Sequence, residues 1–444
     1  MTHVIMMAMS RQEWMEEKLD QVREILKELH KGADFEELKE RFREVLRGVS
    51  PWEIPLVEQE LVAQGISPLE IAALCDLHVA LFRESLMDSR LEGIEPGHPL
   101  DTFLRENEEI LKDSEKLMLY ANSLPKVEGG SRKEVFDQLS KLASELRGIR
   151  RHFVRLQFLL FPYIERRGLT AVPRVLWTKQ DQVMAKIRKL NQILSEGKLE
   201  DAEYILELRS LSDELSRALV DMVFRENRIL YPTVRILLSE EEWSAVKLEE
   251  PEVGYYKVEP REGWEPKDPV YPHEVESGIT EEQISRMPEE MKAMTSLMEK
   301  RDDHVLVRAG DLELKNGYIS LKEMDALLRT LPFEITFVDA DDRLRYYNYR
   351  PGLIFYRSRT VLGRKVELCH PPGSVHIVKK IVEEFRAGKR DVAEFWIDMG
   401  GRKVYIRYFP VRGEDGEYLG TVEVVQDITD IKGIEGEKRL LGEA

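Results

Sequence analysis

The spacing of apolar residues changes once along the chain. Up to about residue 240, apolar side chains recur every three to four positions, which is the period of an amphipathic helix. Beyond about residue 320, they form short alternating runs that are separated by glycine and aspartate, as in strands and hairpins. The pattern therefore predicts a multidomain protein with an all-α N-terminal half and an α+β C-terminal domain.

Two groups of helices are predicted in the first half. Short periodic segments over residues 10–92, punctuated by glycine, proline and capping residues, predict a small helical domain. From Pro99 onward, four longer helices are expected, and together they predict a four-helix bundle over residues 97–246. Their expected ranges are 100–123, 133–167, 172–196 and 201–238.

The C-terminal domain is predicted over residues 320–435. Its first part reads as a strand, a tight polar turn at Asp341–Arg343 and a second strand. A helix over 375–385 is expected next, followed by three long strands joined by glycine-containing turns. These elements predict an antiparallel sheet with helices in the middle of its sequence.

Composition narrows the classes of protein. The 444 residues carry a net charge of −17, which argues against a nucleic-acid partner. The two cysteines, Cys75 and Cys369, are too few for a disulfide framework or a four-thiolate cluster. No apolar run reaches the roughly 20 residues of a membrane helix, so we expect a cytoplasmic protein without a membrane partner. Charged residues make up 34%, which favours a thermophilic source.

The charge is concentrated in one segment. Residues 239–300 contain 17 acidic and 7 basic side chains, a net charge of −10, together with several prolines. We therefore predict an acidic, proline-rich linker over 247–315, extended and self-repelling from 247 to 280. The alternative is an ordered loop that lies across another domain. Four aromatic residues favour this alternative: Tyr255, Tyr256, Trp264 and Tyr271.

Three motifs in the predicted bundle resemble hemerythrin-like (HHE) domains. They are GHP at 97–99 with Phe103, Glu106 and Asn107, then His152-Phe153 with LLFPYIE at 159–165, and finally FRENRILYP at 224–232. The preceding segment contains LCDLH at 74–78. It is similar to the uncharacterised helical domain that commonly precedes such bundles in archaea and anaerobic bacteria.

The resemblance implies an iron site, but the ligand set is incomplete. Gln157 and Gln180 stand where a carboxylate and a histidine are expected, and Met222 lies where the fourth helix should bring a histidine. An intact di-iron centre is therefore not expected. A mononuclear site is one hypothesis, with the ligands His98, His152, Glu226 and Glu106. The alternative is that His98 is a hydrogen bonder at the helix start and His152 a hydrogen-bonded bundle residue.

One further pair lies in the small helical domain. Cys75 and His78 lie three positions apart on one expected helix, so both side chains would share a face. They are additional candidate metal ligands, or else a buried thiol and a packed histidine.

The C-terminal domain resembles the PAS sensor fold. The resemblance rests on FVDADDRLRYYN at 337–348 and GTVEVVQDIT at 420–429. It implies a hydrogen bond between Asp427 and Thr429, an exit helix over 428–441 and a ligand between the sheet and the helices. His370 or Cys369 could bind a haem iron, and His376 is a third candidate. Otherwise the domain holds another small ligand or is a ligand-free interaction module, in which Cys369 is buried, His370 shapes a turn and His376 lies on the surface.

We read no nucleotide-binding loop and no hydrolase motif in the sequence, so an enzyme is not expected. The favoured hypothesis is a sensor that detects a redox, gas or small-molecule cue. It would pass the signal to a protein partner, or to a second copy through the PAS domain. The alternatives are an iron- or haem-binding protein that handles oxygen or redox equivalents, and a ligand-free scaffold.

Overall fold

The computed structural model describes residues 91–275, 279, 281–286, 302, 304–348, 353–370 and 374–438, together with scattered positions between 20 and 40. Two compact units divide the chain between His304 and Val305, and each is described by itself. Cys75 and His78 lie outside the described residues, as does nearly all of the predicted small helical domain. In the part of the chain that is described, every helix is too short or too polar to span a bilayer.

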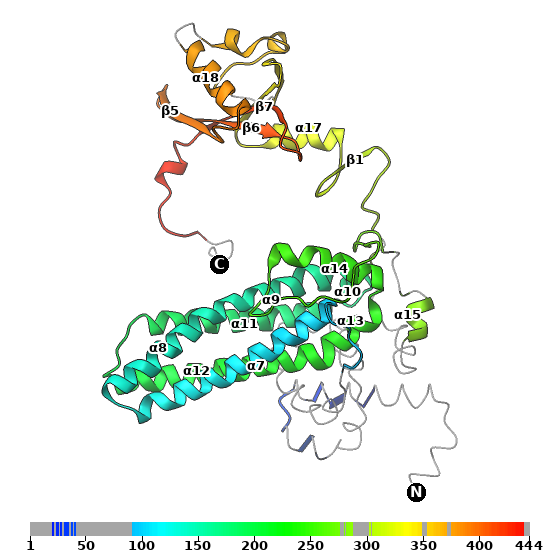
Figure 1. The fold of residues 1–444 in the computed structure, drawn as a ribbon, viewed down its shortest axis with the longest axis vertical. Coiled ribbons are helices and arrows are strands. Elements are labelled where there is room, and N and C mark those ends of the chain that lie inside the picture. Colours follow the sequence, from blue (N-terminus) through cyan, green and yellow to red (C-terminus); the bar gives the residue numbers. More distant parts are fainter. Residues whose placement is uncertain are drawn as a thin grey trace. The chain divides into compact units, whose positions relative to one another are not determined.

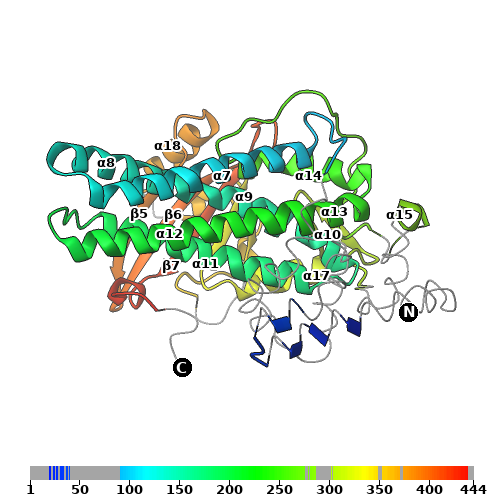
Figure 2. The same cartoon turned by 90° about the horizontal axis from the view of Figure 1, so that it is seen from below.

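Four long helical segments of the first unit run side by side (Figures 1 and 2). The first is α7, Pro99–Ser123, and it is followed by a short 3-10 turn, η1, Leu124–Lys126. The third is α11, Ala171–Leu194. The second and fourth segments are interrupted helices. Their parts are α8 (Gly129–Glu145), η2 (Leu146–Ile149), α9 (Arg150–Arg155), η3 (Leu156–Leu160) and α10 (Phe161–Arg166), and then α12 (Ala202–Arg225), η4 (Glu226–Leu230) and α13 (Tyr231–Leu237).

The interruptions η3 and η4 are π-helical turns, and each is followed by a Pro at the second position of the next helix. Pro162 and Pro232 have no N–H to donate to the carbonyl four residues back. The N–H of Phe161 donates instead to the carbonyl of Leu156, and that of Tyr231 to the carbonyl of Glu226, each five residues back. Such π-turns are frequent at functional sites, and these two occur in the helices that carry His152 and Glu226.

A segment that follows the bundle packs back onto it. Helix α14, Glu240–Val253, begins with a capping box between Ser239 and Glu242. Residues 254–275, which we call the strap, then run along the bundle surface. The Trp264 N–H donates to the Pro96 carbonyl at 2.7 Å. Gly263 has φ 142°, and a Cβ there would lie 2.5 Å from the Pro96 oxygen, so glycine permits this close approach.

The extended, self-repelling linker is therefore wrong for residues 247–275, and the ordered-loop alternative is correct. Residues 247–253 continue helix α14, and the strap is fastened by aromatic and charged side chains. Tyr256 is buried, and Arg261 forms an ion pair with Asp101 of α7. Lys257 pairs with Asp113 at 2.8 Å. The basic side chains of the strap thus pair with acidic residues of the bundle, while two acidic residues of α14, Glu242 and Glu250, pair with the bundle arginines Arg167 and Arg155. A short helix, α15, Glu281–Arg286, follows.

The second unit contains a five-stranded antiparallel sheet in the order β4-β3-β7-β6-β5. As predicted, a hairpin comes first, a helix lies in the middle of the sequence and three long strands complete the sheet. The elements are β3 (Glu334–Asp339), β4 (Leu344–Tyr347), η6 (Arg359–Val361), η7 (Val366–Cys369), α18 (Val375–Arg386), β5 (Ala393–Met399), β6 (Arg402–Arg412) and β7 (Tyr418–Asp427). They are preceded by a two-stranded hairpin, β1 (Asp311–Leu314) and β2 (Gly317–Ser320), and by α17 (Leu321–Thr330).

The end of the sheet domain agrees with the prediction in one respect and differs in another. The Thr429 hydroxyl donates to the Asp427 carboxylate at 2.5 Å and accepts the Lys403 N–H at 2.9 Å, so the expected acid–threonine hydrogen bond is present. The expected exit helix over 428–441 is wrong for residues 428–438. They contain only the 3-10 turn η8, Ile431–Gly433, because Gly433 and Gly436 weaken a helix here and Gly436 has φ 72°.

Candidate functional site

Three of the four candidate metal ligands meet at the centre of the bundle. His152 Nδ1 lies 2.7 Å from Glu106 Oε2, and His152 Nε2 lies 2.9 Å from Glu226 Oε2. All three side chains are buried. Burial disfavours the imidazolium, but the carboxylates of Glu226 and Glu106 outweigh it and raise the pKa of His152 to about 9. The ring is therefore protonated near neutral pH and joins two carboxylates.

The fourth candidate, His98, lies elsewhere. It caps the start of α7, where its Nδ1 accepts the Leu100 N–H at 3.1 Å. Its ring packs between those of Trp243 and Trp264, each 4.9 Å away by centroid. Burial, with the nearby Arg235 and Lys247, lowers the pKa of His98 to about 4. The helix-start alternative is thus the arrangement observed for His98.

Arg155 completes the charged network at the bundle centre. Its side chain is fully buried, forms an ion pair with Glu106 and lies 3.2 Å from Glu250 Oε1 of α14. The guanidinium also stacks on the rings of Phe103 and Tyr255, at 4.4 and 4.7 Å. Burial raises the pKa of Glu250 to about 7, against the opposing charge of Arg155. The Tyr256 N–H donates to Glu106 at 2.6 Å, so the strap contacts the same network.

These residues do not fit a metal centre. The two nitrogens of His152 point in opposite directions, and each is taken by a carboxylate. The Arg155 guanidinium lies against Glu106, where it would repel a metal cation. Gln180 donates nothing to the centre and instead accepts from Gln157 at 2.7 Å. Among the described residues, no three His, Cys, Asp or Glu side chains are grouped to hold one ion. Two protein cations thus supply the positive charge at the bundle centre.

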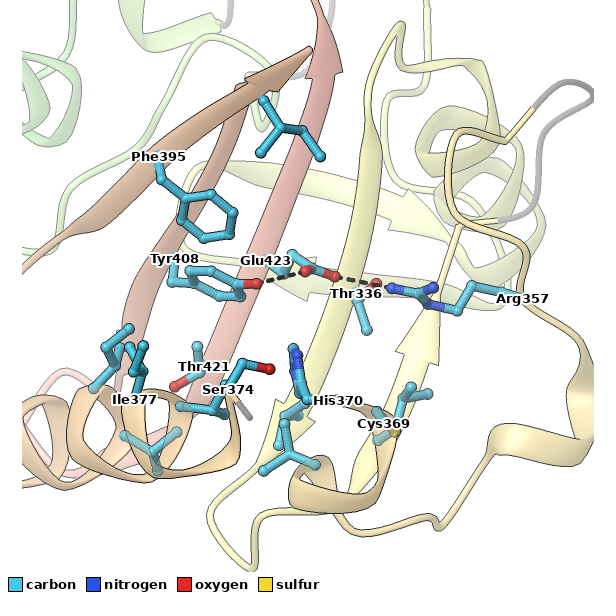
Figure 3. A pocket seen from close by; sticks show the side chains of 17 residues that line it. Thr336, Arg357, Cys369, His370, Ser374, Ile377, Phe395, Tyr408, Thr421 and Glu423 are labelled. Atoms are coloured by element: carbon cyan, nitrogen blue, oxygen red, sulfur yellow. Dashed lines mark hydrogen bonds and ion pairs between the residues drawn. The ribbon is translucent and has the colours of Figure 1, made fainter. Parts of the chain in front are cut away.

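The sheet domain contains a cavity of about 690 Å³ between the inner face of the sheet and α18 (Figure 3). Its wall is mostly aliphatic and aromatic, with side chains from β3, β5 and α18 such as Val338, Phe395, Ile397, Val378 and Ile381. A small number of polar groups converge on it, which is the usual composition of a small-molecule site.

The polar groups of the cavity centre on Glu423 of β7. Its carboxylate accepts from the Tyr408 hydroxyl at 2.9 Å and lies 3.2 Å from the Arg357 guanidinium (Figure 3). The Glu334 carboxylate accepts the N–H groups of Ile354 and Phe355, which positions the segment that carries Arg357. Burial and the Glu423 charge hold the pKa of the Tyr408 hydroxyl well above its usual range.

The three candidate residues of the C-terminal domain have different positions. His370 is half-buried and lines the cavity, with its ring directed toward the sheet (Figure 3). Burial lowers its pKa. Cys369 also contributes to the wall but is exposed, so the idea of a buried thiol is wrong. His376 is an exposed residue of α18 and does not line the cavity, in agreement with the surface alternative.

The cavity does not fit haem well. His370 could ligate a haem iron, but the same cavity wall carries the Glu423–Arg357 pair and the Tyr408 hydroxyl. The apolar faces of a porphyrin would not supply these groups with hydrogen bonds. The polar set favours a ligand that can hydrogen-bond.

Three family models match the chain. Residues 22–88 match a family of unknown function (DUF438), residues 98–234 match the hemerythrin HHE cation binding domain, and residues 324–429 match a PAS domain. The chain combines a DUF438 segment, a hemerythrin HHE domain and a PAS domain. The part of this chain that matches the model described as cation binding thus has an arginine and a histidine at its centre.

Several solved structures are similar to part of the chain. A C-terminal domain from Streptococcus mutans is 39% identical; the match covers 29% of this chain and 100% of that one, with a TM-score of 0.28. A PAS domain from Colwellia psychrerythraea is 18% identical, with 25% and 98% covered and a TM-score of 0.21. A sensory box sensor histidine kinase from Vibrio cholerae is 18% identical, with 24% and 90% covered and a TM-score of 0.19. No curated protein matches the chain.

The predictions from the sequence did not include several residues of the two sites. Arg155 lies three positions after His152, one helical turn along the same face, and that spacing was an available signal. Glu423 stands between Val422 and Val424 on a strand whose inner face also carries Thr421 and Val425. A charged residue at an inward position of an apolar strand could have been identified as unusual. No sequence signal indicates that Glu250 and Arg357 belong to these sites. Glu250 is brought to the bundle centre by a later helix, and Arg357 is brought to the cavity by a loop.

Proposed function

We propose that the chain is a sensor whose PAS domain binds a small molecule in the cavity beneath α18. The observation that supports this most is the cavity itself: about 690 Å³, mostly apolar, with the Arg357–Glu423–Tyr408 group on one side. Its volume is in the range of small-molecule sites. In this proposal, the cue is a small molecule that binds in the PAS domain.

The signal would be passed on by association and not by a catalysed reaction. A ligand in the cavity contacts α18 and strands β3, β5 and β7 together, so binding would change their packing. The receiver is another protein or a second copy of the chain. The bundle and its strap would serve as a structural or interacting part of the same protein.

Native mass spectrometry of the gently purified full-length chain tests this function. We expect a non-covalently bound small molecule in the wild type. Val378 of α18 lines the cavity, so Val378→Trp would fill it and lose the bound molecule. Lys380→Trp adds the same side chain at an exposed position of the same helix and should keep it. Equal ligand content in the two variants would contradict a ligand in this cavity.

A further inference from the structure

The charges that line the PAS cavity cancel. Arg357 and Glu423 are 3.2 Å apart and form an ion pair on its wall. The remaining titratable groups there are the Tyr408 hydroxyl, the His370 ring and the Cys369 thiol. Burial favours the uncharged form of the Tyr408 hydroxyl and of the His370 ring. The Cys369 thiol is exposed, and a thiol with its ordinary pKa of about 8.5 is mostly uncharged near neutral pH. The charged groups of the lining thus sum to zero.

A ligand that carried its own charge would unbalance this cavity. A carboxylate would face Glu423 as well as Arg357, and an ammonium group would face Arg357 as well as Glu423. Either ion would give up its hydration in a mostly apolar space without an unshared partner, and this is strongly unfavourable. An uncharged ligand avoids the penalty.

The polar side of the cavity still has hydrogen-bonding capacity. The Glu423 oxygens accept from Tyr408 and Arg357. No hydrogen bond joins the Thr336 hydroxyl or the His370 ring to another described residue, and Figure 3 shows both directed into the cavity. A hydroxyl and a neutral imidazole each offer one donor and at least one acceptor. A ligand group that both donates and accepts would match them.

We propose that the ligand is an uncharged amphiphile, with an apolar body against α18 and β5 and one end, such as an amide or alcohol, that donates and accepts hydrogen bonds. This inference rests on the proposed sensing function and specifies the chemical class of the cue. The ion pair acts as a charge filter: it is neutral as a pair, but either partner alone would select a ligand of opposite charge.

The test uses three probes with one apolar body, 4-phenylbutanamide, 4-phenylbutanoate and 4-phenylbutylamine, titrated into the full-length chain at pH 7 by calorimetry. We expect the amide to bind about tenfold or more tightly than either ion, equivalent to about 1.4 kcal/mol. Glu423→Gln leaves Arg357 unpaired and should shift the preference to the butanoate. Arg357→Gln leaves Glu423 unpaired and should shift it to the amine.

The comparison of the three probes on the wild-type chain tests the charge preference of the ligand even if a variant does not fold. Binding of either ion as tightly as the amide would overturn the neutral class while leaving the sensing function intact. Absence of binding by all three probes would also overturn the inference as stated. The sensing function itself would fail separately, if the wild type and Val378→Trp carried the same bound material in mass spectrometry.

Discussion

The bundle centre and the PAS cavity each contain an arginine paired with a glutamate, but their surroundings differ. Arg155 is fully buried and meets Glu106, Glu250 and two aromatic rings. Arg357 is 23% exposed and lies beside about 690 Å³ of open space. The first pair is enclosed at the centre of the bundle, whereas the second is on the wall of a cavity. Similar chemistry therefore stabilises a fold in one domain and is available to a ligand in the other.

The largest expected loss of stability follows from replacing Arg155. Arg155→Met would leave the Glu106 and Glu250 carboxylates buried without their shared cation, so we expect the bundle to lose about 3–5 kcal/mol of unfolding free energy. Urea titration of the helical circular dichroism signal measures this. Arg150→Met, at an exposed position of the same helix, is the control and should change stability by less than about 0.5 kcal/mol. Equal losses in the two variants would show that Arg155 is not an essential core cation.

The next effect is a dependence of bundle stability on pH. His152 is faced by the carboxylates of Glu106 and Glu226. Arg155 pairs with Glu106, the Tyr231 hydroxyl donates to Glu226, and Glu250 lies beyond Arg155. Because its pKa is raised from 6.5 to about 9, the folded state binds a proton that the unfolded state has lost. The stabilisation is complete below about pH 6.5 and is lost as the pH rises through 9, with a slope of at most about 1.4 kcal/mol per pH unit.

Urea titrations between pH 7 and pH 9 measure this slope, and His152→Gln should remove it. The window lies above the region where Glu250, with its pKa of about 7, contributes most of its own change. An equal slope in the variant would assign the pH dependence to another group.

A smaller effect is expected at the PAS pair. Glu423→Gln leaves Arg357 without its carboxylate, but that side chain already reaches solvent. We expect a loss of no more than about 1 kcal/mol, because partly exposed ion pairs contribute little. Hydrogen exchange of peptides from β6 and β7 measures it locally. A loss as large as that of Arg155→Met would remove the contrast between the two regions.

The smallest change in stability is expected on removal of metal ions. Since the bundle centre holds its own cations, a chelator should shift the melting temperature of the full-length chain by less than roughly 1 °C. Iron analysis and an absorption spectrum of anaerobically purified protein complete the test. Stoichiometric iron would support the mononuclear hypothesis, and a Soret band would support haem at His370.

The sequence by itself determined the helices and strands and their division into a helical part and a sheet domain. Periodicity predicted the four helical segments, and alternation with turn residues predicted the hairpin and the three long strands, because both patterns are local consequences of backbone geometry. The resemblance to hemerythrin-like domains also implied an incomplete iron ligand set, since Gln180 and Met222 stand where that pattern expects histidines.

Only the tertiary structure decided which of these residues meet. His98 and His152 were equivalent candidates in sequence, yet one caps α7 and the other lies between two carboxylates. Arg155 meets Glu250 across 95 positions, and Arg357 meets Glu423 across 66. Such contacts depend on how helices and strands pack, and no local sequence pattern predicts a contact between residues so far apart in the chain. The strap was ambiguous for the same reason. Its acidic charge predicted extension, and only the structure showed that its basic side chains, Lys257 and Arg261, pair with aspartates of the bundle.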